Sequence, residues 1–543
     1  MLRTVTQVMG ENVPPYLRPP VVLLDGHCPL PREVLGNKGH GLNLMRRLGL
    51  PVPPAFCLTT DVCAQFLAGE DHVLDRIWPD VLDNLRWLEH ETARTFGQGP
   101  RPLLVSVRSG AAQSMPGMLD TVLDLGIDDD VESALAQEAT PQFAADTRNR
   151  FRAMYQRIVL DDDESEPVPD NPFLQLRGAI AAVFRSWHSA RAEAYRRHHG
   201  LGDGGGTAVV VQAMVFGNLS RDSGTGVLFT RNPMTGANEP FGEWLPRGQG
   251  EDVVSGSYDC EPLSALREQQ PGVYADLMTA AETLEDLGRD VQDIEFTVEE
   301  GRLWLLQTRA AKRSAQAAVR LALTLLDEGR IEEDEALRRV TPVHVQTLLS
   351  PSLQPETRLA APLLAKGLPA CPGVASGRAY TDVDAALDAA DNDEDVILVR
   401  TSTSPDDVAG MLAARAIVTQ IGGATSHAAV VSREIGRPAV VGCGAGVTAA
   451  LDGRLITVDG NAGEVREGVL PLTAWSEADS PDLRRLADIA RRRSPLRAHR
   501  AGDYPVLPAG SDAAVRDALA AGHADVVSTT PLITMLTALR LVG

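Results

Sequence analysis

The segment DIEFTVEEGRLWLLQTR, residues 293–309, constrains the fold of this chain more than any other feature. Two runs of strand-forming residues flank a Glu-Gly pair, and glycine accepts the left-handed conformation that a tight hairpin needs. We expect a β-hairpin with a three-residue loop, Glu300–Arg302, so that Glu299 pairs with Leu303.

The same register, counted back along both strands, pairs Glu295 with Gln307 and Asp293 with Arg309. Because side chains two apart share a face of a strand, Asp293, Glu295 and Gln307 should gather on one side. Hard oxygen ligands of this kind suit Mg²⁺ bound to nucleotide phosphates, and Arg309 is placed to neutralise the phosphates. The alternative is the polar outer face of an ordinary hairpin.

A single histidine stands in GGATSHAAVVSREIGRP, residues 422–438. The apolar spacing predicts a helix that begins at Thr425 or Ser426 as N-cap and ends at Gly436. His427 then lies in the first turn, where free N–H groups and the positive dipole end attract anions. This placement favours a neutral nucleophilic histidine that afterwards holds a negative group. The alternative is a histidine at the start of a helix with no catalytic or binding role.

Two basic residues are candidate phosphate ligands. Lys38 stands in a glycine-flanked segment that is not a Walker loop, and Arg108 ends the predicted strand 102–110. Strand-end arginines grip phosphate with two parallel hydrogen bonds. A solvated loop lysine and a surface salt bridge are the respective alternatives.

The net charge of -22 argues against nucleic acid and anionic membranes as partners, but a local basic pocket still admits a phosphorylated small molecule. The six cysteines form no CxxC pair, which fits a reducing compartment. Residues 1–20 lack the apolar core of a signal peptide, and no run reaches membrane-spanning length. We expect a cytoplasmic protein.

The order of elements predicts an α/β (α+β multidomain) chain, and 543 residues suffice for three or four domains. Mixed strands and helices occupy 20–310, including a long helix over 173–200. Residues 311–347 are helical and bridge two globular parts. A compact unit follows at 365–470, and 471–543 form a tail.

Several blocks in one order resemble the pyruvate, phosphate dikinase family of phosphoenolpyruvate-utilising phosphotransferases. The blocks are GNKGHGLNLMRRLGLPVPPAF, VSVRSGAAQSMPGMLDTVLDLG, VQAMVFGNLSRDSGTGVLFTRNP, GQGEDVVSG, DIEFTVEEGRLWLLQTR and GGATSHAAVVSREIGRPAVVGC. The resemblance implies an ATP-grasp nucleotide-binding domain at 1–310, a helical linker at 311–364, a swivelling phosphohistidine domain at 365–470 and a short α/β tail.

The resemblance also implies roles for single residues. His427 is the phosphoryl carrier, Arg309 assists transfer, and Mg²⁺ is held with ATP. The residues implied at the ATP phosphates and the metal-nucleotide are Lys38, Arg108, Asp293, Glu295 and Gln307. Gln212, Met214 and Val215 match the segment beside the adenine, Thr225 and Gly226 the loop over the phosphates, and Glu251 a position near the nucleotide or inorganic phosphate. Thr425 matches a regulatory phosphorylation site in some members, with a simple N-cap as its plainer role.

The C-terminal region departs from the family. Relatives carry a β/α barrel that binds phosphoenolpyruvate and pyruvate and needs roughly 250 residues, whereas 471–543 are far fewer. Residues 493–529 resemble only the barrel's first strand, helix and second strand, a possible barrel remnant. We expect 530–542 to pack as a cap on the histidine domain, and a partner subunit to supply the barrel.

The sequence therefore predicts an ATP-dependent phosphotransferase that uses ATP and inorganic phosphate to phosphorylate His427, releases AMP and pyrophosphate, and passes the group to pyruvate or another acceptor. Two enzyme alternatives are a phosphotransferase with a non-pyruvate acceptor and a phosphoenolpyruvate synthase-like enzyme, although the synthases have cysteine where Ser426 stands. A nucleotide-binding regulator without turnover is the non-enzyme alternative.

Overall fold

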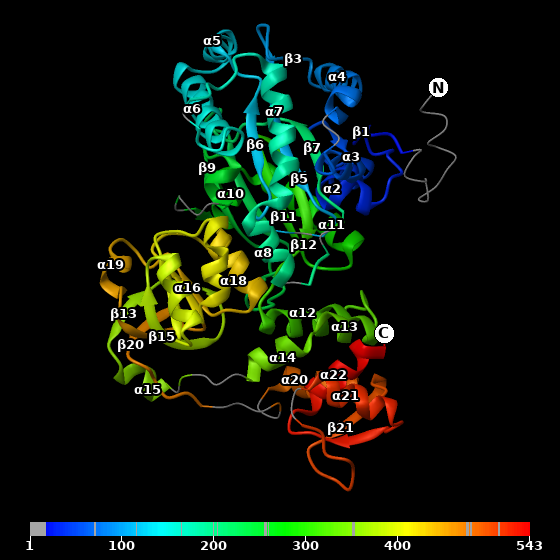
Figure 1. Cartoon of the computed structure of the whole chain (residues 1–543), viewed down its shortest axis with the longest axis vertical. Coiled ribbons are helices and arrows are strands. Elements are labelled where there is room, and N and C mark those ends of the chain that lie inside the picture. Colours follow the sequence, from blue (N-terminus) through cyan, green and yellow to red (C-terminus); the bar gives the residue numbers. More distant parts are fainter. Residues whose placement is uncertain are drawn as a thin grey trace.

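The computed structural model describes residues 18–542 apart from 70–71, 114, 116, 164, 199, 203–204, 255–257, 259, 350–352, 354, 474–476, 478–479 and 509–510. Much of the N-terminal segment considered for a signal peptide, 1–17, lies outside the described residues. Three parts follow one another in Figure 1: an N-terminal part (21–310), the domain that holds His427 (363–467, here the histidine domain), and a C-terminal unit.

The N-terminal part contains two antiparallel five-stranded sheets. The first has the strand order β1-β2-β7-β5-β6. Its strands are β1 (Val21–Leu23), β2 (Ala55–Leu58), β5 (Val105–Gly110), β6 (Thr121–Leu125) and β7 (Ala208–Ala213). The short strands β3 (Thr95–Phe96) and β4 (Pro102–Leu103) form a pair of their own.

Helices pack on the first sheet in one apolar core. They are α3 (Thr60–Leu67), α4 (Val73–Thr92), α5 (Asp129–Glu138), α6 (Pro141–Ile158) and α7 (Pro172–Arg185). Asp128, Thr140 and Asn171 each accept a hydrogen bond from a backbone N–H of the helix that follows, and proline occupies the first turn of α6 and α7. Local capping chemistry therefore sets where these helices begin.

The second sheet has the order β10-β9-β8-β11-β12. Its strands are β8 (Gly224–Phe229), β9 (Phe241–Pro246), β10 (Glu261–Pro262), β11 (Gln292–Glu299) and β12 (Arg302–Ala310). Helices α2 (Arg32–Arg47), α10 (Leu263–Gln269) and α11 (Pro271–Gly288) share an apolar core with this sheet and with Val210 of the first sheet. The core that α2 enters thus joins the two sheets.

The histidine domain is built on one eight-stranded mixed sheet with the order β13-β20-β19-β15-β16-β17-β18-β14. Its strands are β13 (Leu363–Lys366), β14 (Leu368–Cys371), β15 (Val374–Tyr380), β16 (Val396–Arg400), β17 (Ala416–Thr419), β18 (Ala439–Val441), β19 (Leu455–Asp459) and β20 (Glu464–Glu467). Its helices are α16 (Val383–Asp391), α17 (Val408–Ala413), α18 (His427–Ile435) and α19 (Val447–Leu451), preceded by α15 (Pro355–Ala360). Because α18 links the parallel strands β17 and β18, His427 stands just beyond the sheet.

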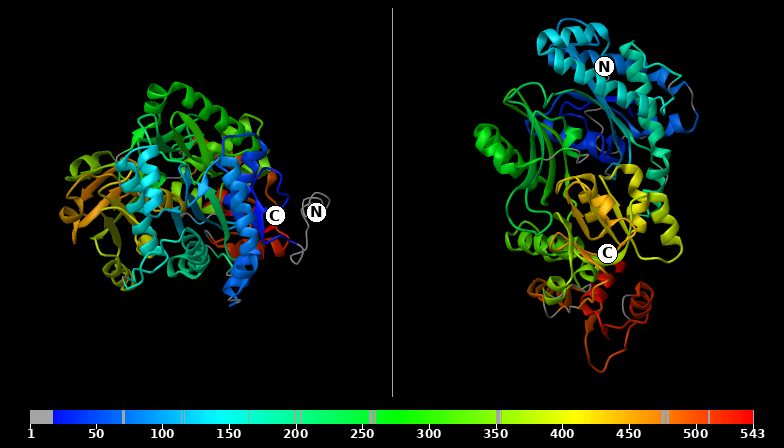
Figure 2. Two further views of the ribbon diagram at one scale, coloured as in Figure 1. Left: turned by 90° about the horizontal axis from the view of Figure 1, so that it is seen from above. Right: turned by 90° about the vertical axis from the view of Figure 1, so that its left-hand side faces the viewer.

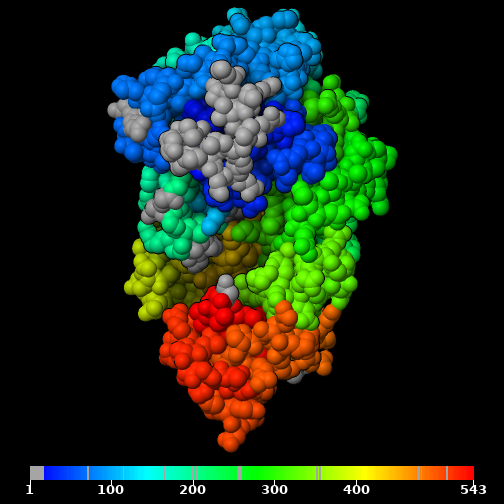
Figure 3. All heavy atoms as spheres, turned by 90° about the vertical axis from the view of Figure 1, so that its right-hand side faces the viewer, coloured from blue at the N-terminus to red at the C-terminus, as the bar shows by residue number. Residues whose placement is uncertain are grey.

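The tail does not cap the histidine domain, so that expectation is wrong. Its apolar residues, among them Leu532 and Met535, share one core with Leu325 and Val345 of the helices predicted to be a bridge. This C-terminal unit contains α12 (Ala315–Asp327), α13 (Glu333–Arg339), α14 (Pro342–Leu349), α20 (Pro481–Arg493), α21 (Asp512–Ala520), α22 (Pro531–Val542) and the parallel strands β21 (Arg497–His499) and β22 (Asp525–Val527). Figure 3 shows the orange and red residues beneath the yellow-green helices.

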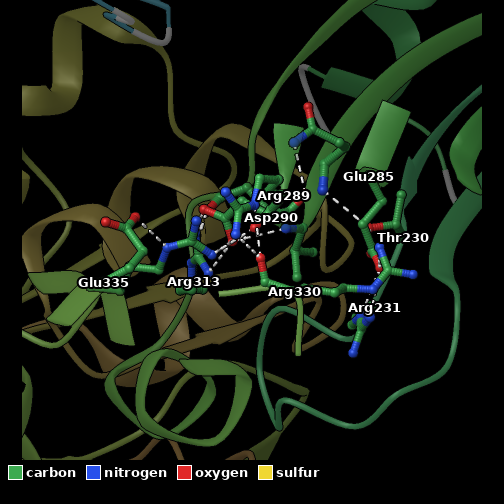
Figure 4. Close-up of polar contacts among 12 residues, drawn as sticks. Thr230, Arg231, Glu285, Arg289, Asp290, Arg313, Arg330 and Glu335 are labelled. Atoms are coloured by element: carbon green, nitrogen blue, oxygen red, sulfur yellow. Dashed lines mark hydrogen bonds and ion pairs between the residues drawn. The ribbon is translucent and has the colours of Figure 1, made fainter. Parts of the chain in front are cut away.

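An ion-pair network fastens the C-terminal unit to the N-terminal part (Figure 4). Arg231, only 3% exposed, bonds both Glu285 of α11 and Glu328 at the end of α12. Asp290 binds the guanidinium of Arg313 through both carboxylate oxygens, at 2.8 and 2.6 Å. Buried, bidentate pairs of this kind fix orientation because each charge needs its partner once it leaves water.

Two further expectations change in detail. The helix predicted over 173–200 is broken into α7, a short 3₁₀ turn and α8 (Ala190–His198), because Ser189 is extended. The strand predicted over 102–110 is interrupted at Leu104. No helix among the described residues is both long and apolar enough to cross a membrane.

Candidate active site

One cavity of about 830 Å³ lies where the two N-terminal sheets meet the histidine domain. Figure 2 shows the histidine domain, yellow to orange, beneath the N-terminal part. Every site residue predicted from the sequence lines this cavity. They are Lys38, Arg108, Gln212, Met214, Val215, Thr225, Gly226, Glu251, Asp293, Glu295, Gln307, Arg309, Thr425 and His427.

The hairpin at 293–309 has the expected register at its functional end. Asp293 pairs with Arg309 and Glu295 with Gln307. The loop is nevertheless shorter than predicted, because Glu300 and Gly301 alone form the turn, with φ of 49° and 76°. The pairing of Glu299 with Leu303 is therefore wrong, since Glu299 faces Arg302.

A β-bulge compensates for the shorter turn. Between the Glu295 and Phe296 pairs the register shifts, so that Leu306 has no partner residue on β11. The carbonyl of Leu306 instead accepts a hydrogen bond of 3.2 Å from Nη1 of Arg108. The bulge thus restores the expected register and also provides an anchor for a site arginine.

Arg108 lies within β5, not at its end as predicted, and its guanidinium is held on three sides. Besides Leu306, it donates to Oε1 of Gln212 at 3.3 Å and to Oε2 of Glu295 at 3.1 Å. The amide nitrogen of Gln212 donates to Pro53. Gln212 therefore orients Arg108, a role that the sequence pattern did not suggest.

Asp293 and Arg309 form a buried pair with 2.8 Å between Nε and Oδ2. The other oxygen of Asp293, Oδ1, is buried and has no hydrogen-bond partner among the described residues. Burial raises the pKa of Asp293, and Arg309 only partly opposes this shift. An orphaned carboxylate oxygen beside Glu295 and Gln307 fits a divalent cation, which would neutralise and ligate it.

The charges of Arg108 and Arg309 lower the pKa of both Glu295 and Lys38, which favours the charged form of the carboxyl group and the neutral form of the amine. Burial acts to raise the pKa of Glu295, but Arg108, Arg309 and Lys38 outweigh it, so the pKa is lowered. Burial, reinforced by Arg108 and Arg309, holds the pKa of Lys38 well below its ordinary value. The site therefore concentrates positive charge that a bound polyphosphate would offset.

Lys38 is not the solvated loop lysine of the alternative reading but lies in the first turn after a break in α2. The break is at Gly36, with φ 67° and ψ 167°. A Cβ atom on Gly36 would lie 1.6 Å from the carbonyl oxygen of Gly110. This close approach of two backbones sets Lys38 against the end of β5, and a side chain at either glycine would push it away.

The residues predicted to lie beside the adenine and over the phosphates are in strands β7 and β8 and in the segment that follows β7. Met214 and Val215 follow β7, beside the first sheet. Thr225 and Gly226 lie in β8 and not in a loop, which corrects the expectation. Thr225 donates to the carbonyl of Phe296, and a Cβ on Gly226 would meet the carbonyl oxygen of Glu243 at 2.5 Å.

Glu251 opens the short helix α9 (Gly250–Val254) on another wall of the cavity. Burial, with help from the charge of Asp252, raises its pKa to about 7. Asp252 itself pairs with Arg150 at 2.8 Å. An acid that titrates near neutrality beside a paired arginine is the pattern of a functional site.

His427 is buried at the cavity wall, with 7% of its surface exposed. Its Nδ1 lies 3.0 Å from the hydroxyl oxygen of Thr403, and its Nε2 has no hydrogen-bond partner among the described residues. A Cβ on Gly117 would lie 3.0 Å from Nε2. Burial lowers the pKa of His427 to about 4, although Asp407 and Asp406 oppose the shift. The ring is therefore neutral, as expected, but burial is the main cause.

Thr425 contacts the N-terminal part and does not cap α18. The N-cap is Ser426, without a side-chain cap bond. Glu243 of β9 accepts hydrogen bonds from the hydroxyl of Thr425 and from the backbone N–H of Ala424, the latter at 2.8 Å. A Cβ on Gly423 would collide with this carboxylate. The absence of a side chain at Gly423 thus admits the Glu243 carboxylate.

Sequence reasoning missed Thr403 and Glu243. Thr403 precedes Ser404-Pro405, a turn signal far from His427 in sequence, and Glu243 lies in a strand without a recognisable motif. Both acquire their contacts only when separate segments pack, so no local pattern could have identified them.

The fold and site define a class of protein: two antiparallel sheets around a cavity lined by basic and acidic residues, closed by a separate domain that presents a histidine. The AMP/ATP-binding domain of pyruvate phosphate dikinase matches residues 32–274. The mobile domain of phosphoenolpyruvate-utilising enzymes matches 392–463. The chain belongs to the pyruvate, phosphate dikinase family.

Curated relatives agree with this assignment. The chain is 40% identical to pyruvate, phosphate dikinase 2 of Zea mays over 496 residues, covering 81% of this chain and 56% of the relative. It is 40% identical to pyruvate, phosphate dikinase of Clostridium symbiosum, covering 80% and 56%. It is 39% identical to the enzyme of Rhizobium meliloti, covering 85% and 59%. The chain thus spans a little over half the length of these relatives.

Proposed function

We propose that this chain phosphorylates His427 with ATP and inorganic phosphate, releasing AMP and pyrophosphate. The observation that carries the proposal is the position of His427 on the wall of the same cavity as Lys38, Arg108 and Arg309. Phosphoryl transfer needs the accepting histidine and the cations that neutralise a polyphosphate around the same substrate, which explains why they line one cavity.

The proposed chemistry depends on charge neutralisation and position. Nε2 of His427 attacks the β-phosphorus, the bridging bond to the α-phosphate breaks and AMP leaves; inorganic phosphate then takes the terminal phosphoryl group, which releases pyrophosphate and leaves one phosphoryl group on the ring. For this attack Nδ1 must carry the ring proton and donate a hydrogen bond to the hydroxyl oxygen of Thr403. Lys38, Arg108 and Arg309 stabilise the charge on the transferring and leaving groups. Gly117 lies against the ring, and Nε2 has no competing hydrogen-bond partner among the described residues.

We propose that Asp293, Glu295 and Gln307 hold Mg²⁺ with the nucleotide. The buried, unpartnered Oδ1 of Asp293 supports this assignment. When bound, the ion would offset phosphate charge. The chain's own contribution is to hold three oxygen donors on adjacent strands, where the bulge at Leu306 keeps their register.

The nucleotide-binding role is assigned to 1–310 and the carrier role to 365–470, joined by the segment 311–364. Inorganic phosphate is assigned to the cavity wall that contains Glu251. Arg150 lies near this wall because it forms an ion pair with Asp252, the residue after Glu251. Thr425 is proposed as a regulatory position, because a phosphate there would face Glu243. A cytoplasmic location is proposed because the six cysteines form no CxxC pair, which fits a reducing compartment.

We propose pyruvate as the acceptor, since the named relatives are pyruvate, phosphate dikinases. A partner subunit that carries an acceptor barrel and a non-pyruvate acceptor remain alternative proposals. A phosphoenolpyruvate synthase-like reaction would use water in place of phosphate, and a regulator would bind ATP without turnover.

The test is incubation with Mg²⁺, phosphate and ATP labelled in the β-phosphate. We expect an acid-labile phosphoprotein, absent from His427→Asn, which should still bind ATP. Dependence of the label on added phosphate separates the dikinase from the synthase reaction. An acid-stable label, or one that persists in His427→Asn, would contradict the proposal.

A further inference from the structure

Glu434 lies in the last turn of α18, the helix that begins with His427. The partial negative charge at the C-terminal end of a helix repels a carboxylate, so Glu434 needs a positively charged or hydrogen-bonding partner. The neighbouring Arg433 is not that partner, because its guanidinium donates to the carbonyls of Ala370 and Ala424. The side chain of Glu434 is only 5% exposed, so water does not provide it either.

The two side chains that bond Glu434 both come from outside the histidine domain. The hydroxyl of Tyr195, in α8, donates to Oε1, and so does the ammonium of Lys312, which follows β12. Oε2 is buried without a hydrogen-bond partner among the described residues. Figure 1 shows α8 beside α18 at this junction. Within the protein, the carboxylate therefore takes these hydrogen bonds from the other side of the domain junction.

Glu434 lies at an interface between two domains and not in the core of one domain. Tyr195 belongs to a small apolar cluster that includes Met118 of the N-terminal part and Val408 of the histidine domain. Lys312 lies three residues beyond Arg309. Burial acts to lower the pKa of Arg309, but the charges of Asp293, Glu295 and Glu434 raise it. The contact thus ties the far end of α18 to the strand that carries a site residue.

We propose that Glu434, Tyr195 and Lys312 form a docking latch that positions His427 in the cavity. This inference rests on the proposed function only in requiring that the histidine domain move. When the domain leaves, Glu434 regains water; when it returns, the Glu434 side chain is 5% exposed and pairs with Lys312, whose side chain stays 32% exposed. A carboxylate that is buried and paired in one state alone biases the equilibrium between the states and penalises misaligned docking.

The test measures docking without catalysis. Diethyl pyrocarbonate acylates accessible imidazole nitrogens, and peptide mass spectrometry resolves the rate at His427. Glu434→Gln should raise this rate by about tenfold or more, because a neutral amide binds Lys312 weakly. Glu467→Gln is the matched control, since it removes the ion pair with Arg454 inside the histidine domain. Its rate should stay within about twofold of the wild type.

A double-mutant cycle with Tyr195→Phe tests coupling. If the latch exists, the double variant should exceed the wild-type rate by less than the product of the two single effects. Strictly multiplicative effects, an unchanged rate in Glu434→Gln, or an equal rise in Glu467→Gln would each overturn the proposal. Should Glu434→Gln be insoluble, Lys312→Met applies the same test with an unaltered histidine domain.

Failure of the latch and failure of the proposed function are distinguishable. Absence of ATP-derived label on wild-type His427 would reject the function, while the acylation rates would still report docking. Rescue of labelling at high ATP would not be expected for Glu434→Gln, because the defect concerns the acceptor histidine and not nucleotide binding.

Discussion

The hydroxyl oxygen of Thr403 lies 3.0 Å from Nδ1 of His427, and both side chains are buried. Thr403 lies in the loop after β16, and His427 begins α18. With the Thr403 hydroxyl as acceptor, the proton lies on Nδ1 and Nε2 keeps its lone pair, as the proposed transfer requires.

Thr403→Val should lower the rate of His427 labelling by about tenfold or more, because the ring loses the acceptor that fixes its tautomer. The labelling rate from β-labelled ATP is the measurement. Thr403→Ser keeps the hydroxyl and should retain most of the rate. Equal rates in Thr403→Val and the wild type would contradict the assigned tautomer.

Glu295→Ala should reduce labelling by at least about a hundredfold, because it removes an oxygen donor and frees Arg108 from one of its three anchors. Far-ultraviolet circular dichroism should be unchanged, since the side chain lines a cavity. Raising Mg²⁺ should recover part of the rate if Glu295 ligates the ion; full activity without added Mg²⁺ would reject the role.

Glu251→Gln should stabilise the protein above pH 7. The folded-state pKa of Glu251, about 7, exceeds its ordinary value of 4.5, so the folded state binds more protons between these pH values and loses stability as the pH rises. The gain in free energy of unfolding should be on the order of 1–3 kcal/mol above pH 7 and vanish below about pH 4.5. Chemical denaturation without nucleotide measures it, and the exposed Glu268→Gln should show no such pH dependence.

Thr425→Asp should impair docking, because a second carboxylate would face that of Glu243. We expect at least about a tenfold fall in His427 labelling, with ATP binding retained. Adding Glu243→Gln should relieve part of the defect. A defect of the same size in the presence and absence of Glu243 would show that repulsion is not its cause.

Gly36→Ala should destabilise the N-terminal part by on the order of 2–4 kcal/mol, since the new methyl group would overlap the carbonyl of Gly110. Gly49→Ala is the matched control: its φ is also positive, at 73°, but nothing lies within 4 Å of the added Cβ. The control should lose only about 1 kcal/mol. Thermal unfolding of both variants measures the difference.

The hairpin shows how far sequence alone reaches. Alternation and the Glu-Gly turn predicted a hairpin correctly, because turn chemistry and side-chain alternation are local, but Asp293 lies opposite Arg309 as predicted only because two departures from the prediction cancel. The inferred loop was still one residue too long, and the bulge at Leu306 cancelled the error. Only the packing of β12 against its neighbours, where Arg108 takes the freed carbonyl, places that bulge.

The sequence by itself determined the helix that begins near His427, the glycine that ends it, and the set of charged residues of the site. Tertiary structure alone decided that Thr403 orients the ring, that Glu243 and Glu434 hold the two ends of α18, and that the tail packs on α12–α14. The physical reason is that caps and turns satisfy backbone groups nearby in the chain. Burial, pKa shifts and contacts between domains depend instead on which distant surfaces exclude water together.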